Sequence, residues 1–156
     1  SGVGRVGVPL LVQCGAGGPA ARAAGHGFDA RMLNQSGFVP AARARRPDTL
    51  GRQQQRLDEI EASLRLISTT FQRLPFGPLT VALPQESGEG IGCAESARGD
   101  VWHWLRLDHG QIATCFPRDP GWALWPAAEA VLLGAAVEDA GLIAASFGLS
   151  VSGMDL

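Results

Sequence analysis

The feature that most constrains the fold is a long stretch of helical periodicity in the middle of the chain. Between residues 48 and 74, apolar side chains recur every three or four positions and polar ones lie between them. Asp48 is a good helix cap, and Pro75 ends the pattern. The spacing predicts one long amphipathic helix with its apolar face buried and its polar face in water. The apolar positions are Leu50, Leu57, Ile60, Leu64, Ile67, Phe71 and Leu74.

The segments on either side of this helix carry weaker signals. The first 47 residues are rich in Gly, Ala, Pro and Arg, which predicts irregular structure apart from a short apolar run at residues 8–12. After the helix, residues 79–83 form a short apolar run closed by Pro84. We expect a strand there, leading into a glycine-rich bend at residues 88–92.

The second half of the chain predicts a β-hairpin followed by two helices. Residues 101–107 and 111–116 flank Asp108-His109-Gly110, a turn in which Gly110 takes a positive φ. The segment 117–120 is typical of irregular structure, and Pro126 is typical of a helix start. A second apolar segment covers residues 142–149.

These elements predict an α+β fold, mainly helical, with 1–156 as a single domain. We expect the 48–74 helix to pack against the 126–148 helical region, with the β-hairpin capping one side. A chain of 156 residues with 46% hydrophobic and 18% charged residues can bury one core. No stretch is long and apolar enough to predict a membrane span.

Charge and composition exclude several classes of function. Thirteen basic residues against fifteen acidic ones give a net charge of -2, which argues against a nucleic-acid partner. Every basic residue is Arg, and the chain has no Lys and no Tyr. Mechanisms that need a Schiff-base lysine, a P-loop lysine or a tyrosine acid are therefore excluded within this chain.

The cysteines, histidines and tryptophans give no clear site. Cys14, Cys93 and Cys115 are widely spaced, which favours buried inert thiols over a disulfide framework. His103 and His109 fall on a hairpin face and a turn tip, where they do not converge on a metal. The four tryptophans could form a binding cleft, but packing in the core is favoured.

The strongest local signal for chemistry is the glycine-rich segment at residues 88–100. Within it, Glu95 and Arg98 place opposite charges three residues apart, and the Arg98 guanidinium could clamp an anionic or carbonyl ligand. The alternative is that Arg98 pairs with Glu95 or Asp100 and only holds the loop. The segment lacks the spacing and the following lysine of a nucleotide-binding loop.

Several segments, taken in order, resemble the large catalytic subunit of nickel-iron hydrogenases and the related 49-kilodalton-type quinone-site subunit of respiratory complex I. The motif Gly-Pro-x-Ala-Arg-x-x-Gly is similar to residues 18–25, with one residue more between Pro and Arg than in some members of the family, and a following Asp-x-Arg matches residues 29–31. The long helix ending in Leu-Pro-x-Gly-Pro resembles residues 57–78, and a Gly-x-Gly-x-x-Glu-Ala-Pro-Arg-Gly loop resembles residues 90–99. The resemblance implies part of a hydrogenase large-subunit-like fold, and we expect the chain to be the carboxyl-terminal fragment of a larger subunit.

The resemblance also assigns positions around a former metal site. Hydrogenases end this region with Ser-Phe-Asp-Pro-Cys-x-x-Cys, whereas Ser150 and Gly153 stand where the two cysteines would be. A serine hydroxyl cannot replace a thiolate and glycine offers no ligand, so we expect no metal here. Arg98 matches the arginine above the metal centre, with Glu95 as the acid before it. Ala97 replaces the usual proline, and Gly148 replaces the acid that faces this arginine.

By this resemblance, the expected function is that of a non-nickel subunit in an oxidoreductase complex, forming one wall of a quinone-reduction cavity with Glu95 and Arg98 binding substrate. Iron-sulfur clusters would belong to partner subunits, with no cofactor in this chain. The location implied is cytoplasmic, peripheral to the inner membrane through those partners. The alternative is a structural or assembly module of a membrane-bound hydrogenase-like complex without catalysis. We expect the isolated fragment to be inactive, to expose an apolar patch and to be capable of forming a homodimer.

Overall fold

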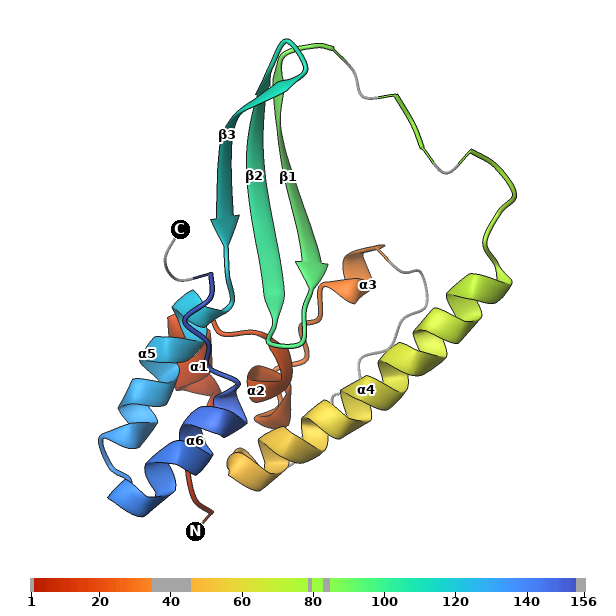
Figure 1. Ribbon diagram of the computed structural model, residues 1–156. Coiled ribbons are helices and arrows are strands. Elements are labelled where there is room, and N and C mark those ends of the chain that lie inside the picture. Colours follow the sequence, from red (N-terminus) through yellow and green to blue (C-terminus); the bar gives the residue numbers. More distant parts are fainter. Residues whose placement is uncertain (1, 35–45, 79, 83–84, 154–156) are drawn as a thin grey trace.

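The computed structural model describes residues 2–34, 46–78, 80–82 and 85–153, which form a mixed α+β structure. Six α-helices and one three-stranded antiparallel sheet lie within these residues. The short helices α1, α2, α5 and α6 gather at one end, α4 runs along their side, and the sheet rises from them as an arm (Figure 1). The elements are α1 Val8–Cys14, α2 Gly18–Ala23, α3 Arg31–Asn34, α4 Thr49–Gln72, β1 Gly88–Glu95, β2 Asp100–Asp108, β3 Gln111–Arg118, α5 Gly121–Leu132, the 3₁₀ turn η1 Val137–Asp139, and α6 Ala140–Phe147.

The amino-terminal region is more regular than its composition indicates, because α1 and α2 are short helices. Each has a proline in its first turn, where the missing N–H costs no helical hydrogen bond. Gly15 ends α1 in the left-handed conformation and returns its N–H to the Val12 carbonyl at 2.9 Å. The prediction of irregular structure over the first 47 residues is therefore wrong for α2, whereas α1 begins with the apolar run 8–12 that was excepted from it, and residues 35–45 lie outside the described part.

The apolar core lies between α1, α5 and α6. Its largest members are Leu11, Leu124, Ile143 and Phe147, each at most 1% exposed, and alanines fill the space between the helices. Small side chains allow the helix backbones to approach closely. The core therefore forms at the helical end of the molecule and leaves the sheet outside it.

Helix α4 confirms the predicted long helix and its Asp48 cap. Its polar face is buried and its apolar face is exposed, which is the reverse of the prediction. The Asp48 side chain accepts a hydrogen bond from the Gly51 N–H at 3.0 Å. The buried side chains of α4 include Arg52, Gln55 and Glu59. The apolar side chains are exposed instead, and we refer to five of them, Leu57, Ile60, Leu64, Ile67 and Phe71, as the apolar stripe; their exposures run from 50% to 71%.

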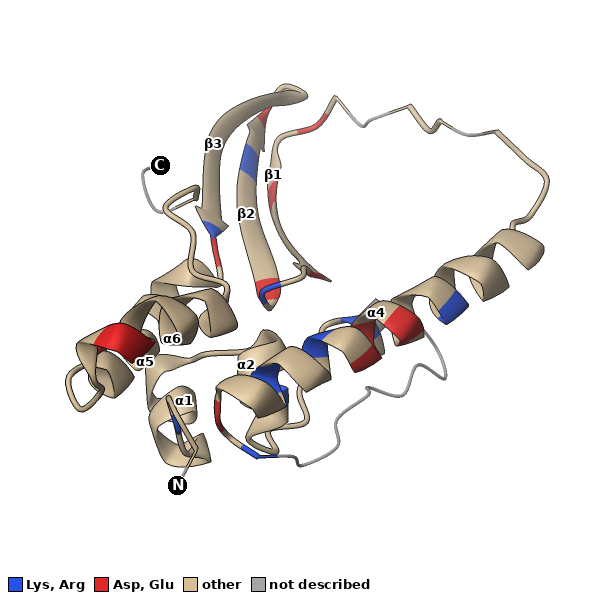
Figure 2. Cartoon of the chain, turned by 60° about the horizontal axis from the view of Figure 1, so that its bottom comes forward, with Lys and Arg blue, Asp and Glu red and all other residues tan. Residues whose placement is uncertain are grey.

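The reversal has an electrostatic cause. The polar face of α4 meets α2 and α6, which bring Arg22 and Ser146 to it, so its buried Glu59 and Arg52 find partners inside the molecule. Figure 2 shows charged positions on α4 from the part beside α2 to beyond the middle of the helix, and none in its last turns. The apolar stripe has no comparable neighbour among the described residues. The expected apolar patch is thus present on α4.

The sheet has the order β1-β2-β3, and all its neighbouring strands are antiparallel. The predicted hairpin is confirmed, with Gly110 at φ 76° and His109 also left-handed at φ 47°. The predicted bend at residues 88–92 is wrong, because these residues begin β1 and pair with β2. Within the predicted strand 79–83, residues 80–82 have no regular structure, and 79 and 83 lie outside the described residues.

Two prolines occupy places that their sequence context does not predict. Pro117 belongs to β3, an edge strand on which a missing N–H is tolerated. Pro126 lies inside α5 and does not start it. Helix α5 begins at Gly121, whose N–H donates to the Asp119 carboxylate at 2.7 Å, and the carbonyl of Pro120 accepts from Leu124. The charged and turn-forming residues before Gly121 therefore set the helix start.

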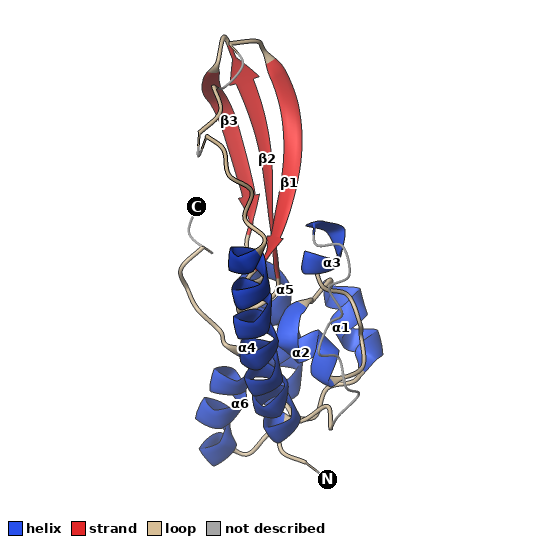
Figure 3. Ribbon diagram, turned by 90° about the vertical axis from the view of Figure 1, so that its right-hand side faces the viewer, coloured by secondary structure: helices blue, strands red, loops and turns tan. Residues whose placement is uncertain are grey.

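The predicted packing of α4 against the carboxyl-terminal helices is confirmed. The buried guanidinium of Arg52 donates two hydrogen bonds to Ser146 Oγ in α6, at 3.0 and 2.7 Å, and lies over the ring of Phe147. Burial lowers the pKa of Arg52 to about 10, with the Asp48 carboxylate opposing this effect. Figure 3 shows that the sheet stands beyond the helices, so it does not cap them as expected.

The tryptophans and cysteines are less buried than predicted. Trp122 is 39% exposed, and Trp102, Trp104 and Trp125 are half-buried. Cys14 and Cys93 are half-buried and Cys115 is exposed. The indole N–H of Trp102 donates to Asp100 at 2.6 Å, so this side chain needs a polar neighbour. Among the described residues, none of the helices is long and apolar enough to span a bilayer.

Candidate functional site

The site begins at the tight turn between β1 and β2, which holds Ser96 to Gly99. The Ser96 N–H donates to the Gly99 carbonyl at 2.8 Å, and Gly99 takes φ 145°, a conformation that only glycine adopts readily. A Cβ on Gly18, the first residue of α2, would come within 2.1 Å of the Arg98 carbonyl oxygen. The glycines therefore allow the backbone of the β1–β2 turn to contact the backbone at the start of α2.

Behind this turn lies a buried network of charges, which we name the Arg22 cluster and define as Arg22, Asp29, Arg31, Glu59 and Glu95. The fully buried Arg22 guanidinium makes a bidentate pair with Glu59, with both distances 2.7 Å. It also donates to Glu95 at 2.8 Å and lies 3.3 Å from Asp29. One guanidinium from α2 thus joins carboxylates from α4, β1 and the loop before α3.

Arg31 completes the cluster from the side of α3. It donates to both carboxylate oxygens of Asp29, at 2.9 and 2.6 Å, and to Ser63 Oγ on α4 at 2.8 Å. Its guanidinium lies 3.8 Å from Glu59. Two guanidiniums therefore face three carboxylates, and the cluster as a whole carries one excess negative charge when every member is ionised.

The pKa values of two carboxylates in the cluster are shifted in opposite directions. Burial raises the pKa of Glu95, although Arg22 and the Ala30 N–H partly oppose this. At Asp29, burial also acts to raise the pKa, but hydrogen bonds from Arg31 and the charge of Arg22 outweigh it and lower the pKa. Burial alone would lower the pKa of Arg22, and its pairs with Glu59 and Glu95 raise it instead. The neighbouring groups therefore compensate the ionised form of Glu95 less well than they compensate the ionised form of Asp29.

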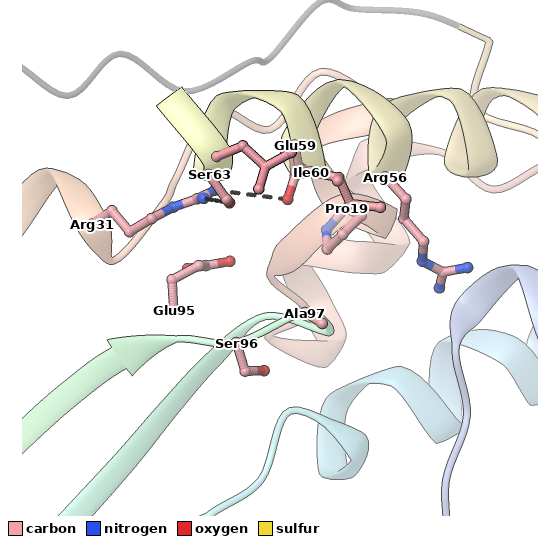
Figure 4. Close-up of a pocket in the computed structure, with 10 residues that line it drawn as sticks. Pro19, Arg31, Arg56, Glu59, Ile60, Ser63, Glu95, Ser96 and Ala97 are labelled. Atoms are coloured by element: carbon pink, nitrogen blue, oxygen red, sulfur yellow. Dashed lines mark hydrogen bonds and ion pairs between the residues drawn. The ribbon is translucent and has the colours of Figure 1, made fainter. Parts of the chain in front are cut away.

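A cavity of about 330 Å³ opens beside the cluster, between α4, the start of α2, α3 and the β1–β2 turn. Figure 4 shows Arg31, Glu59 and Ser63 on one side of it and Glu95, Ser96 and Ala97 on the other. Ile60 and Leu64 of the apolar stripe also line it. The cavity therefore joins charged groups to an apolar wall, which suits a ligand with a polar head and an apolar body.

The structure separates the two candidate substrate-binding residues. Glu95 belongs to the Arg22 cluster, where it accepts from Arg22 and from the Ala30 N–H at 2.9 Å. The half-buried Arg98 guanidinium makes no hydrogen bond or ion pair with any described residue. Asp100 pairs with Arg118 at 3.1 Å and with Trp102. Among the described residues, Arg98 thus does not hold the loop by pairing with Glu95 or Asp100.

The positions matched to lost metal ligands lie near the end of the described chain. The Ser150 carbonyl accepts from the indole N–H of Trp125, and the Gly153 carbonyl accepts from that of Trp122, both at 3.2 Å. A Cβ on Gly148 would lie 3.9 Å from Cγ of Arg98, so the start of this tail passes beside that arginine. The described residues contain no group of three or more His, Cys, Asp or Glu able to hold a metal ion. Hydroxyl and glycine at positions 150 and 153 do not fit a nickel centre.

Comparison with known proteins places these residues in a family. The family model of the respiratory-chain NADH dehydrogenase 49 Kd subunit matches residues 1–87, more than half of the chain. The chain belongs to this family. The match includes α2, α3 and α4, and therefore four members of the Arg22 cluster; Glu95 and Arg98 lie beyond it.

Individual relatives agree with the family. One subunit of the NADH-quinone oxidoreductase from Syntrophobacter fumaroxidans is 32% identical over 99% of the chain, and its counterpart from Desulfotalea psychrophila is 31% identical over 71% of it. The alpha subunit of the membrane-bound hydrogenase from Pyrococcus furiosus is 28% identical over 71%. The matches span 44% of the first relative and 32% of each of the other two, so the chain covers less than half the length of these proteins.

Sequence reasoning found the motifs but not the site that they build. It treated Arg22, Asp29 and Arg31 as marks of resemblance, and it did not single out Glu59 or Arg56. A signal was available, because Arg52, Gln55, Arg56, Glu59 and Ser63 recur at three- and four-residue intervals and therefore share one side of the helix. A polar stripe of this kind, opposite an apolar one, indicates a helix with partners on both faces.

Proposed function

We propose that the chain forms one wall of a quinone-reduction cavity in an electron-transfer complex, as a non-nickel relative of the hydrogenase large subunit. The observation that carries the proposal is the cavity beside the Arg22 cluster, in a chain that belongs to the 49 Kd subunit family. Its charged rim and its apolar wall of Ile60 and Leu64 match the polar head and apolar body of a quinone.

In this proposal, Arg98 and Glu95 act on the quinone head group. The Arg98 guanidinium, which has no partner among the described residues, donates to a carbonyl oxygen and stabilises the negative charge that develops there on reduction. Glu95 lines the cavity and its pKa is raised by burial, which favours proton uptake beside the head group. Arg98 is not a lining residue but follows Ala97, which is, so in this proposal it approaches the head group from the end of the turn. Reduction of a quinone to a quinol consumes two electrons and two protons; the electrons would come from iron-sulfur clusters of partner subunits.

The proposal extends to the molecule in which the chain works. The chain would be a single-domain carboxyl-terminal fragment of a subunit with the hydrogenase large-subunit-like fold, inactive by itself and without a cofactor of its own. An iron-sulfur subunit would be among its partners. It would lie on the cytoplasmic side, peripheral to the inner membrane through the other subunits.

A second candidate function is that of an assembly module without catalysis. The apolar stripe of α4 favours it, because five exposed apolar side chains on one helix face are unusual for a surface that stays in water. The stripe would then join the chain to other parts of a membrane-bound hydrogenase-like complex, or two copies of the isolated fragment to each other.

Substitution of Arg98 in the full complex separates these two functions. With Arg98→Ala, lost electron transfer to quinone in a complex that still assembles supports the catalytic role, whereas unchanged turnover supports the assembly module. Arg106→Ala is the matched control, because Arg106 is an exposed arginine of β2 whose guanidinium contacts Thr114 on the sheet. Assembly would be measured by co-purification of the partner subunits, and turnover by quinone-dependent oxidation of the electron donor.

A further inference from the structure

The two edge strands of the sheet differ in how well they are protected against pairing with another strand. Strand β3 carries Pro117, which has no N–H, and a bulge at Ala113, which the register of β2 with β3 skips. Strand β1 has neither feature, and its eight residues pair with β2 in an unbroken register. It stands on the arm beyond the helices, and most of its residues are exposed (Figure 3). Among the described strands, β1 is therefore the one best able to accept a further strand.

One face of β1 carries a row of glycines. Gly88, Gly90 and Gly92 alternate along the strand and therefore point to the same face of the sheet. A Cβ on any of them would meet no atom within 4 Å, and the hollow above them is bordered by Leu105 and Leu107 of β2. Glycine inside a strand often marks a place where another backbone approaches closely. No side chain of this row can obstruct a strand that pairs with the free edge.

The sequence of β1 allows the strand to pair with a second copy of itself in one register. When two antiparallel copies are related by a two-fold axis, opposite residues point to the same face, so one residue faces its own copy. With Ile91 at the axis, Ile91 faces Ile91, Glu89 faces Cys93, and the glycines face one another. A shift of the axis by one residue in either direction would bring Glu89 opposite Glu95 or Ile91. Only the register about Ile91 joins apolar to apolar side chains without opposing two acids.

We infer that β1 is the interface of a homodimer, in which the two three-stranded sheets join edge to edge with Ile91 facing Ile91 at the two-fold axis. Strand β3 of each copy then forms an outer edge, where Pro117 and the bulge at Ala113 discourage further pairing. Assembly stops at two copies, because the free edge of each is used by the other. The inference goes beyond the proposed function, since it needs neither the cavity nor a quinone.

Sedimentation equilibrium of the 156-residue chain over a range of concentrations tests the inference. Ile91→Glu places two carboxylates opposite each other at the axis and should weaken the dimer by at least about tenfold. Ile112→Glu is the matched control and should leave the dimer unchanged, because Ile112 lies on β3 and is 65% exposed, against 69% for Ile91. A chain that stays monomeric at the highest concentration, or a dimer that the two variants weaken equally or not at all, would overturn the inference.

Opposite charges at the same position provide the positive test. Ile91→Lys should be monomeric by itself for the same reason as Ile91→Glu, and a mixture of the two variants should form a dimer with one copy of each. Native mass spectrometry would identify the mixed dimer by its mass, and added salt should weaken it. Circular dichroism of each variant would establish that the new charge leaves the fold intact. If two folded variants do not combine, position 91 does not face its own copy and the inference fails.

The apolar stripe of α4 is another surface that could join two copies, and Leu64→Glu distinguishes the two interfaces. Leu64 belongs to the stripe and is 62% exposed. If β1 forms the interface, Leu64→Glu keeps the dimer and Ile91→Glu loses it. The opposite result would place the interface on the stripe and overturn the inference. Neither result depends on turnover in the complex with Arg98→Ala, so a failure here is distinguishable from a failure of the proposed function.

Discussion

The Arg22 cluster and the two arginines Arg56 and Arg98 are two regions near the β1–β2 turn that differ in how their charges are compensated. Arg22 contacts three carboxylates and is fully buried. Arg56 has only neutral hydrogen-bond acceptors, and Arg98 has no partner among the described residues. The first region is a network of buried ion pairs, whereas the guanidiniums of the second make no ion pair with any described residue.

This difference separates the contributions that the two regions make to stability. A buried ion pair is weak evidence of net stabilisation, but removal of one partner leaves an uncompensated charge in the interior. An arginine without a partner among the described residues leaves none of their charges uncompensated when it is removed. Stability measurements on the two regions should therefore diverge strongly, even though every substitution removes one guanidinium.

The largest effect is expected at Arg22. Arg22→Met should lower the free energy of unfolding by about 3–5 kcal/mol, because Glu59, Glu95 and Asp29 would remain buried without their common partner. Urea denaturation followed by circular dichroism would measure the change, with Arg106→Met as an exposed control. A loss below about 1 kcal/mol would mean that the network relaxes or takes up protons and is not a structural requirement.

A smaller but still large effect is expected where the two regions touch. Gly18→Ala adds a Cβ that would lie 2.1 Å from the Arg98 carbonyl, at a residue with φ 70°. Strain of this kind costs about 1–3 kcal/mol, before the backbone clash is included. Gly27→Ala is the control, because a Cβ there has no atom within 4 Å. Equal thermal midpoints for the two variants would show that α2 and the turn can separate freely.

The sequence was sufficient to predict elements that depend on local signals. The long helix follows from its period and its Asp48 cap, and the hairpin follows from Gly110 between two apolar strands. The buried face of α4 could not be predicted, because hydrophobicity favours the apolar stripe. The actual choice depends on Arg22 and Ser146, which are distant in sequence. Long-range ion pairs and hydrogen bonds override local patterning here.

The candidate site shows the same division between local and distant information. Glu95 and Arg98 were recognised from one glycine-rich segment. Glu95 has a charged partner and Arg98 has none among the described residues, and this difference depends on where Arg22, Asp100 and Arg118 lie in the fold. The separation of Glu95 from Arg98 follows from Arg22 reaching β1 from α2. Pro117 and Pro126 were misjudged for a related reason, since an edge strand and an already started helix tolerate proline in ways that composition does not reveal.

The pH dependence of stability should have opposite signs at two members of the Arg22 cluster. The lowered pKa of Asp29 contributes stability that is present above its unfolded pKa and is lost as the pH falls through the folded one. The raised pKa of Glu95 contributes stability that is present below its unfolded pKa and is lost as the pH rises through the folded one. Free energies of unfolding across the acidic range, for Asp29→Asn and Glu95→Gln against the unaltered chain, would test this.

Those two variants serve as controls for each other, because each keeps the shape of its side chain and removes only its charge. The advantage of the unaltered chain over Asp29→Asn should grow as the pH rises from the acid limit. Its advantage over Glu95→Gln should shrink as the pH rises above 4.5, the ordinary pKa of the group. Two curves with the same slope would mean that the carboxylates titrate as one unit and that the cluster does not distinguish them.

The smallest effect is expected at Arg98. Arg98→Gln should change the free energy of unfolding by no more than about 0.5 kcal/mol, because the guanidinium has no partner to lose among the described residues. Arg56→Gln should cost slightly more, since it removes the hydrogen bond to the Ala145 carbonyl at the end of α6. Urea denaturation in chloride buffer would measure both variants. A loss at Arg98 as large as that at Arg22 would make Arg98 a structural residue, and the contrast between the two regions would then not hold.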